Sequence, residues 1–274
     1  MTAASDPITS LQNPLIRQIR KLHQAKERHR QGTFLLEGTH LVEEACAVGY
    51  PLQQVLYTAD WQARYPNLAD RLPQQAAAFR QVSPEVLKST ATTVNPDGVI
   101  ATAARRPQSV DSSLISLGLA VERLQDPGNL GSIIRTGAAA GVNGLWLSAD
   151  SVDIDHPKVL RASTGQWFRS PLQVWPSLRD GLSRAQAAAA QAGSPLQVVA
   201  TTPTAAMDYW SLDCCQPTLF LLGNEGSGLS APLLAAATQT VKIPLAAGVE
   251  SLNVAIAAAL LLYEARRQRT SLTH

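Results

Sequence analysis

Residues Leu117 to Ser148 read LGLAVERLQDPGNLGSIIRTGAAAGVNGLWLS and place a helical pattern between two apolar runs. The runs Leu117 to Arg123 and Gly144 to Ser148 have the length and composition of buried strands. The residues between them, Leu130 to Ala140, predict a helix that begins after an Asp-Pro-Gly turn, with Asn129 as its candidate cap. This segment starts an alternation of strands and helices that runs to the end of the chain.

The alternation continues after Ser148. Further strands are predicted at Leu196 to Thr201, Thr218 to Leu222 and Thr240 to Ile243. Helices are predicted at Ser177 to Ala192, Ser230 to Ala236 and Leu252 to Gln268. Strands that alternate with helices favour a mostly parallel sheet covered by helices on both faces. We therefore expect an α/β domain over residues 117–274.

The first 104 residues predict a smaller α/β module. An amphipathic helix with a basic outer face is expected from Asn13 to about Arg30, and short strands and helices follow it as far as Thr102. Residues 105–116 mix Pro, Ser, Gln and charge without apolar periodicity, which is typical of a linker. The expected organisation is a domain at 1–104, a linker at 105–116 and a second domain at 117–274.

The composition of the 274 residues, 45% hydrophobic and 16% charged, is that of a globular protein and excludes collagen-like and disordered classes. The N-terminus lacks the pattern of a signal peptide, and the apolar stretch Val254 to Tyr263 is shorter than the roughly 20 residues of a membrane span. Three cysteines without a CxxC pair predict neither a disulfide framework nor a zinc site. We expect a cytoplasmic protein without a membrane partner and without a metal.

Basic residues concentrate at the N-terminus. The first 30 residues hold six basic and two acidic side chains, an excess of +4, whereas residues 31–274 hold 17 basic and 19 acidic side chains, a net charge of −2. Such a cluster is typical of a segment that binds a polyanion, although a solvated helix face has the same composition. The candidate nucleic-acid contacts are Arg17, Arg20, Lys21, Lys26, Arg28 and Arg30.

Two more motifs follow predicted strands. Leu221 to Ser230 reads LLGNEGSGLS, and its three glycines permit a close approach of backbone N–H groups to a ligand. Its G-x-x-G-x-G spacing differs from the dinucleotide fingerprint, and no Gly-Lys-Ser/Thr marks a Walker loop. Ile243 to Asn253 reads IPLAAGVESLN and leads into an apolar helix, which we expect to be buried in the core or against a second subunit.

Arg135 lies among small residues on the helix after the Asp-Pro-Gly turn. Small neighbours let another backbone or a ligand come close, and a guanidinium there can hold a phosphate or a carboxylate with two hydrogen bonds. A salt bridge on a tightly packed helix is the alternative for Arg135, and a plain tight turn is the alternative for the glycine-rich motif. Ser251 and Asn253 are natural helix caps.

The three blocks DPGNLGSIIRTGAAAGV, LLGNEGSGLS and IPLAAGVESLNVAIAAALLLYEARRQ, in this order, resemble the motifs of the SpoU/TrmH family of RNA 2′-O-ribose methyltransferases in the SPOUT superfamily. Val159 to Phe168 resembles that family's segment between the first and second motifs. Residues 13–45 are similar to the RNA substrate-binding domain of many members, which itself resembles a ribosomal RNA-binding protein. The resemblance spans nearly the whole chain.

The resemblance implies that the C-terminal domain is threaded as a deep trefoil knot and forms a homodimer through its helices. It implies S-adenosylmethionine as cofactor, held around Gly223, Gly228, Ile243 and Leu252. The catalytic residues it implies are Arg135, Asn129, Glu225, Ser251 and Asn253. A guanidinium has no acceptor site and is a poor proton acceptor at neutral pH, so we expect Arg135 to clamp a phosphate and stabilise the developing alkoxide.

The function implied is methylation of a ribose 2′-hydroxyl in structured RNA. Ribosomal RNA is favoured over transfer RNA because the N-terminal domain resembles a ribosomal protein. A transfer RNA methyltransferase and a non-catalytic RNA-binding protein on the same fold are the alternatives. A Rossmann-type methyltransferase or dehydrogenase is disfavoured, because no glycine-rich loop follows an early strand with an acidic residue about 20 positions later.

Overall fold

The computed structural model describes residues 6–105, 115–224 and 226–270. The chain forms two compact units, one of residues 1–107 with 153–168 and one of residues 108–152 with 169–274. Residues 153–168, which the sequence places in the C-terminal domain, therefore belong to the first unit. Most of the expected linker, 105–116, lies outside the described residues. In the described part of the chain, no helix is long and apolar enough to cross a membrane.

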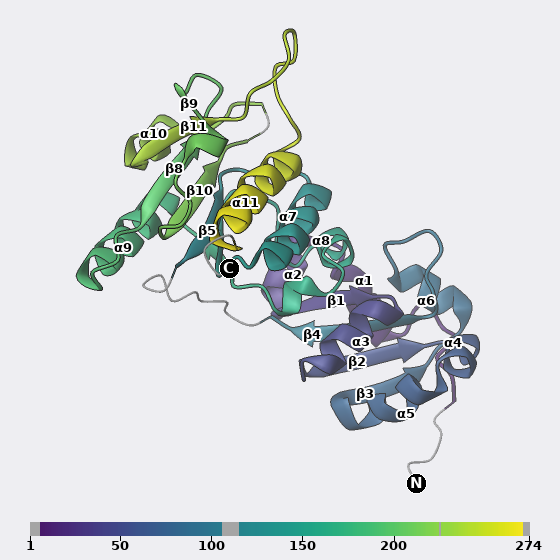
Figure 1. The fold of residues 1–274 in the computed structure, drawn as a ribbon. Helices are drawn as coiled ribbons and strands as arrows, with labels where there is room; N and C mark the ends of the chain where they lie inside the picture. The colour runs from purple at the N-terminus through teal and green to yellow at the C-terminus, as the bar shows by residue number, and fades with distance from the viewer. Residues whose placement is uncertain (1–5, 106–114, 225, 271–274) are drawn as a thin grey trace. The chain divides into compact units, whose positions relative to one another are not determined.

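The first unit is built on a four-stranded sheet in the order β1-β4-β2-β3 (Figure 1), in which β2 and β3 are parallel and the other pairs antiparallel. Its strands are β1 (Thr33–Glu37), β2 (Leu52–Tyr57), β3 (Ala76–Gln81) and β4 (Val99–Ala104). Its helices are α1 (Pro14–Lys21), α2 (Ala25–Gln31), α3 (Thr39–Ala47), α4 (Ala59–Arg64), α5 (Pro66–Gln75), α6 (Pro84–Thr90) and α8 (Pro157–Ala162).

The single basic helix expected from Asn13 to Arg30 is divided into α1 and α2. Asn13 caps α1 by accepting from the N–H of Leu15 at 2.9 Å, and Leu22 ends that helix with its side chain in the core. The extended backbone of Gln24 separates the two helices. A residue of α2, Arg28, donates from Nη1 to the carbonyl oxygen of Leu22 at 2.9 Å, which ties the two helices together at the break.

Arg28 is almost fully buried, with 1% of its surface exposed. Its Nε and Nη2 atoms donate to Oδ2 of Asp153 at 2.9 and 2.6 Å. Arg105 pairs with the same carboxylate and with that of Asp155. Burial raises the pKa of the Asp155 carboxyl, and the charge of Arg105 acts in the opposite direction. These buried ion pairs hold the segment that begins at Asp153 within the first unit.

The second unit contains a seven-stranded sheet in the order β7-β6-β5-β10-β8-β11-β9, and all its pairs are parallel. Its strands are β5 (Leu117–Val121), β6 (Gly144–Ser148), β7 (Leu172–Trp175), β8 (Gln197–Thr201), β9 (Met207–Asp208), β10 (Thr218–Leu222) and β11 (Gln239–Lys242). Its helices are α7 (Pro127–Ala140), α9 (Leu178–Gln191), α10 (Ala231–Ala236) and α11 (Val254–Thr270). The expected α/β fold with a mostly parallel sheet is confirmed.

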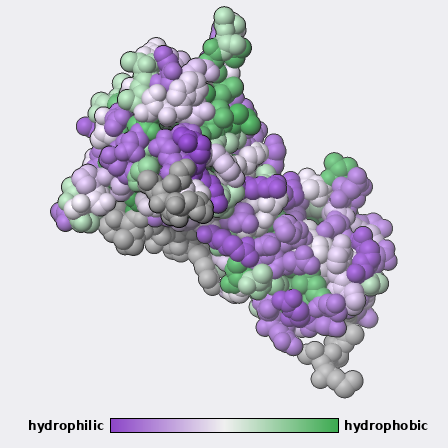
Figure 2. Space-filling view, in the orientation of Figure 1, coloured by the Kyte–Doolittle hydropathy of each residue, from purple (hydrophilic) through white to green (hydrophobic). Residues whose placement is uncertain are grey.

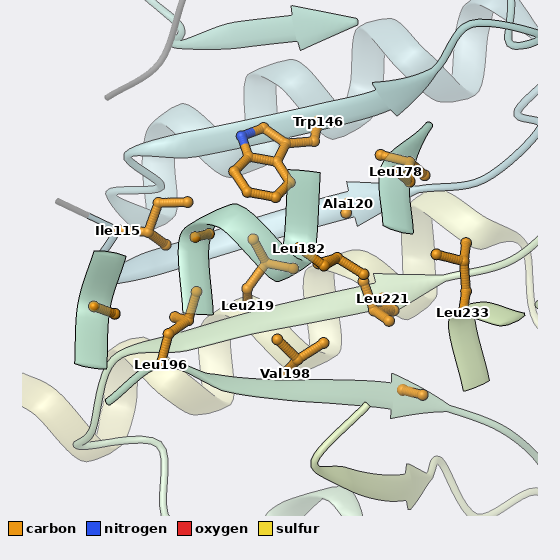
Figure 3. Packing of buried hydrophobic residues seen from close by; sticks show 13 residues of the cluster. Ile115, Ala120, Trp146, Leu178, Leu182, Leu196, Val198, Leu219, Leu221 and Leu233 are labelled. Atoms are coloured by element: carbon orange, nitrogen blue, oxygen red, sulfur yellow. The ribbon is translucent and has the colours of Figure 1, made fainter. Parts of the chain in front are cut away.

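Helices lie on both faces of this sheet, with α9 and α10 on one face and α7 and α11 together on the other (Figure 1). Figure 3 shows the core beneath α9, where Leu178 and Leu182 of that helix pack with Trp146, Leu219 and Leu221 from the strands. These side chains are at most 4% exposed. Strands buried on both faces carry continuous apolar runs, which is why the sequence identified them.

Helix α7 begins earlier than the sequence predicts. Asp126, rather than Asn129, is its N-cap, and its Oδ1 accepts from the N–H of Asn129 at 2.9 Å. Pro127 occupies the first helical position, where its fixed φ is favourable and its missing N–H costs nothing. The prediction that Asn129 caps this helix is therefore wrong. Asn129 lies in the first helical turn, where its side chain has a different partner.

The buried Arg28 pairs lead to a prediction for stability. Arg28→Ala should lower the free energy of unfolding by about 3 kcal/mol, the lower end of the range for a broken buried pair, because Arg105 still contacts Asp153. Chemical unfolding of the full chain, followed by circular dichroism, measures this change. Arg30→Ala is the matched control, because Arg30 is exposed and pairs with Glu27 on the surface of the same helix. Equal, small effects of both substitutions would contradict a structural role for Arg28.

Candidate active site

The carboxyl ends of β8, β10 and β11 surround a cavity of about 340 Å³. From β5 the chain continues to β6 on one side of the sheet, and from β10 it continues to β11 on the other. The chain thus changes direction between β5 and β10, and the cavity lies on the β10 side of this point. The cavity is lined by three loop segments, which are Thr201–Pro203, part of Leu222–Gly228 and part of Ile243–Val254.

The glycine-rich loop after β10 folds back on itself. Asn224 and Gly228 exchange backbone hydrogen bonds of 3.2 and 2.9 Å, and Oδ1 of Asn224 accepts from the N–H groups of Gly226 and Ser227. A Cβ atom on Gly223 would lie 2.1 Å from the carbonyl carbon of Gly228, so no side chain fits there. Gly228 has a φ of +66°, which also favours glycine. Gly223, Gly226 and Gly228 all line the cavity, so part of its wall is backbone.

The loop after β11 carries the third motif to the same place. Ile243, Ser251 and Leu252 line the cavity. Asn253 caps α11, since its Oδ1 accepts from the N–H of Ala255 at 2.9 Å. Its Nδ2 donates to Oδ1 of Asn129 at 2.9 Å, which joins the first motif to the third across 124 positions of the sequence.

The residues singled out by sequence do not all meet at one point. Gly223, Gly228, Ile243 and Leu252, the expected cofactor contacts, and Ser251, an expected catalytic residue, line the same cavity. Asn129 and Asn253 contact each other beside it. Arg135 is exposed on α7, and the described cavity lining does not include it. Glu225 lies outside the described residues.

Several cavity-lining residues were not singled out from the sequence, among them Thr201 and Glu250. Oγ1 of Thr201 is buried and, among the described residues, has no hydrogen-bond partner. Glu250 is exposed and lines the mouth of the cavity. The polar Thr201 at the end of an apolar strand was the available signal, because side chains at the carboxyl ends of parallel strands face the ligand crevice. In the part of the chain that is described, no cluster of His, Cys, Asp and Glu residues could hold a metal ion.

The six basic side chains of the N-terminal segment differ in their exposure to solvent. The exposed cations are Arg17, Arg20, Lys21, Lys26 and Arg30. Two shallow hollows of about 380 and 360 Å³ share Arg17 and Lys21 in their linings, the first with Arg30 and the second with Arg20. Arg28 is a correction to the expected contacts, because its buried guanidinium is directed at Asp153 and at backbone carbonyls.

Helix α11 has one uncovered face in the single chain. Val254, Ala258 and Leu261 are buried, whereas Ile256 and Tyr263 are 54% and 50% exposed. These two line a hollow of about 440 Å³. Figure 2 shows hydrophobic side chains at the N-terminal end of this helix and along the loop before it. We expected this helix to be buried in the core or against a second subunit. Within the single chain, only one face of α11 is buried.

Comparisons with known proteins agree with this arrangement. Residues 116–263 match the model of the SpoU rRNA Methylase family, and residues 13–101 match that of the MRM3-like substrate binding domain. An uncharacterised tRNA/rRNA methyltransferase of Synechocystis is 49% identical, over 98% of this chain and 96% of that protein. A 23S rRNA (uridine(2479)-2′-O)-methyltransferase of Streptomyces viridochromogenes is 34% identical, over 89% of this chain and 86% of that protein.

Among solved structures, the SpoU methyltransferase AviRb from Streptomyces viridochromogenes, in complex with the cofactor AdoMet, is similar with a TM-score of 0.85 and 32% identity. The similarity covers 95% of this chain and 99% of that one, so it includes both units. Family models, relatives and structures thus agree with each other and with the three motifs. The chain belongs to the SpoU rRNA methylase family.

Proposed function

We propose that this protein transfers a methyl group from S-adenosylmethionine to a ribose 2′-hydroxyl of ribosomal RNA, in the cytoplasm. The observation that carries the proposal is the cavity in which the second and third motifs meet at the carboxyl edge of the parallel sheet. Supporting it, the Streptomyces relative is a 23S rRNA 2′-O-methyltransferase. The Synechocystis relative is named for both tRNA and rRNA, so transfer RNA is the second candidate substrate.

The cavity fits the cofactor. Its volume of about 340 Å³ is within the range of small-ligand sites, and its lining combines apolar side chains with hydroxyl, amide and carboxylate residues. Ile243, Leu245 and Leu252 provide apolar surface for the adenine ring, and Gly223 and Gly228 contribute backbone to the cavity wall. The buried hydroxyl of Thr201 would gain a partner. When bound, S-adenosylmethionine supplies an electrophilic methyl group on a sulfonium.

The chain's own residues then position the RNA. Arg135 carries a permanent positive charge. We therefore propose that it binds the phosphate next to the target ribose and stabilises the developing alkoxide. Because a guanidinium has no acceptor, the hydroxyl proton leaves to a phosphate oxygen or to water. Asn129 and Asn253, joined by their hydrogen bond, hold α7 and the third motif in register beside the cavity. Glu225 and Ser251 complete the proposed catalytic set.

The trefoil knot and the homodimer belong to the same proposal. The loop after β11 lies against the loops after β8 and β10 around one cavity, which supports threading of the chain at that point. Near its end, α11 donates from Gln268 to the carbonyl oxygen of Leu212 and from Arg269 to that of Cys214. The half-exposed Ile256 and Tyr263 support a homodimer through α11.

Comparing 2′-O-methyl sites in RNA from cells with and without the protein tests the proposed reaction. The same comparison shows whether the methylated RNA is ribosomal RNA or transfer RNA.

Cofactor binding is predicted to depend on Gly223. Gly223→Ala should weaken S-adenosylmethionine binding by about tenfold or more, because the new Cβ would force the backbone of Gly228 and Leu229 away. Isothermal titration calorimetry without RNA measures the dissociation constant. Gly137→Ala, on α7 and not among the residues that line the cavity, is the matched control, since its Cβ would meet only side-chain atoms of Val142, the nearest at 3.6 Å. Equal dissociation constants for both variants and the wild type would contradict the cavity assignment.

Arg135→Ala should reduce methyl transfer at least about 100-fold, the cost of removing one group that stabilises charge in a transition state. Cofactor affinity should be nearly unchanged, because the partner of Arg135 is the RNA. Arg135→Lys should also be impaired, since an ammonium cannot form two parallel hydrogen bonds to phosphate. Turnover and calorimetry on one preparation separate these effects, with Arg179→Ala on the exposed side of α9 as control. Turnover within a few-fold of wild type would contradict the catalytic role and leave Arg135 as a structural residue.

Replacing Arg17, Lys21 and Lys26 together by Gln should flatten the slope of log K against log salt for RNA binding by about 2, since each phosphate contact contributes about 0.7 on a single strand. Arg28 is left intact because it is buried. Binding should weaken similarly for different RNA sequences. The control is a triple replacement of Arg64, Arg71 and Arg80, exposed cations elsewhere in the first unit. An unchanged slope in the variant of Arg17, Lys21 and Lys26 would mean that the basic segment is only a solvated helix face.

A further inference from the structure

Arg123, two residues after β5, has a strained backbone. Its φ is +53°, and Thr164 is the only other non-glycine residue in the described ranges with a positive φ. A side chain in the left-handed region costs free energy and persists where the surroundings hold it in place, often at functional sites. Arg123 lies at the switch point between β5 and β10, where the chain leaves the sheet in opposite directions.

The backbone of Arg123 is bonded on two sides. Its N–H donates to Oγ of Ser148, at the end of β6, at 2.7 Å. Its carbonyl oxygen accepts from Nδ2 of Asn224 at 3.0 Å and from Nε2 of Gln125 at 3.2 Å. The left-handed conformation therefore orients a carbonyl toward the first residue of the glycine-rich turn. Asn224 in turn holds the N–H groups of Gly226 and Ser227.

The side chain of Arg123 reaches the other end of the same turn. Its Nη2 donates to the carbonyl oxygen of Gly228 at 3.4 Å, the oxygen that also accepts from the N–H of Asn224. Nη2 lies 3.8 Å from Oε2 of Glu122, a carboxylate that accepts from the N–H of Ser230 at 2.7 Å. Nε of Arg123 is buried and has no partner among the described residues. One residue thus contacts the turn at both of its ends.

We propose that Arg123 is a positioning residue that holds the Asn224–Gly228 turn in the shape the cofactor cavity requires. Gly228 lines that cavity, and the backbone of Gly223 is packed against it. The inference rests on the proposed function, because it assumes that the cavity binds S-adenosylmethionine. A guanidinium suits this role, because it stays charged at neutral pH and its planar shape directs its donors at fixed angles.

The backbone and the side chain can be separated by substitution. Arg123→Gly removes the guanidinium and also relieves the strain, since glycine adopts a positive φ without steric cost. We expect it to leave the thermal unfolding midpoint undiminished and to raise the dissociation constant of S-adenosylmethionine roughly tenfold, the loss of one hydrogen bond to a charged group. Arg123→Lys should recover part of the affinity. Thr164→Gly, which relieves the other positive φ, is the matched control and should leave the affinity unchanged.

Hydrogen exchange gives a readout that does not need the cofactor. The amide of Gly228 donates to the carbonyl oxygen of Asn224 at 2.9 Å, so its exchange should become several-fold faster in Arg123→Gly and stay the same in Thr164→Gly. Unchanged exchange at Gly228 would overturn the proposal, even if the wild-type protein failed to bind the cofactor and the proposed function were wrong. An unchanged cofactor affinity with weakened RNA binding would also overturn it, since Arg123 would then be an RNA contact.

Discussion

The contact between the backbone of Gly223 and that of Gly228 and Leu229 is the constraint on which the site depends. There is no room for even one carbon atom between them, so the chain leaving β10 must fold back tightly before it enters α10. That tight turn lets Asn224 pair with Gly228, and it places the side chain of Asn224 within reach of the carbonyl of Arg123 after β5. The turn therefore contacts the carboxyl ends of the neighbouring strands β5 and β10, and the cavity lies next to the turn.

A second interaction on which the site depends is the hydrogen bond between Asn129 and Asn253. It connects the start of α7 with the start of α11, and these two helices pack together on one face of the sheet. The residues that we propose to contact the cofactor and the residue that we propose to contact the RNA lie on different elements. The cavity is lined by loops at the carboxyl ends of β8, β10 and β11, whereas the exposed guanidinium of Arg135 lies further along α7. This division is consistent with a reaction whose main physical requirement is the positioning of two substrates.

In the N-terminal segment of the first unit, some basic side chains are exposed to solvent and one forms a buried ion pair. Arg17, Arg20, Lys21, Lys26 and Arg30 are exposed and give the surface a positive field, as a polyanion-binding segment requires. Arg28, in the same run of sequence, is buried with Asp153 and two backbone carbonyls as partners. A buried charge of this kind is tolerated because every strong donor it directs inward meets an acceptor. Net charge along a sequence therefore overestimates the number of cations available to RNA.

The sequence by itself determined the alternation of buried strands with helices, the glycines of the turn after β10 and the capping role of Asn253, because propensity, periodicity and steric freedom are local properties. Its three motifs also indicated the family. Only the tertiary structure decided that Arg28 points inward, that residues 153–168 join the first unit and that Thr201 offers a buried hydroxyl. The partner of Arg28 is 125 positions away, and the cavity around Thr201 exists only after three loops meet. Burial and pairing of this kind depend on contacts between distant residues, which no local pattern encodes.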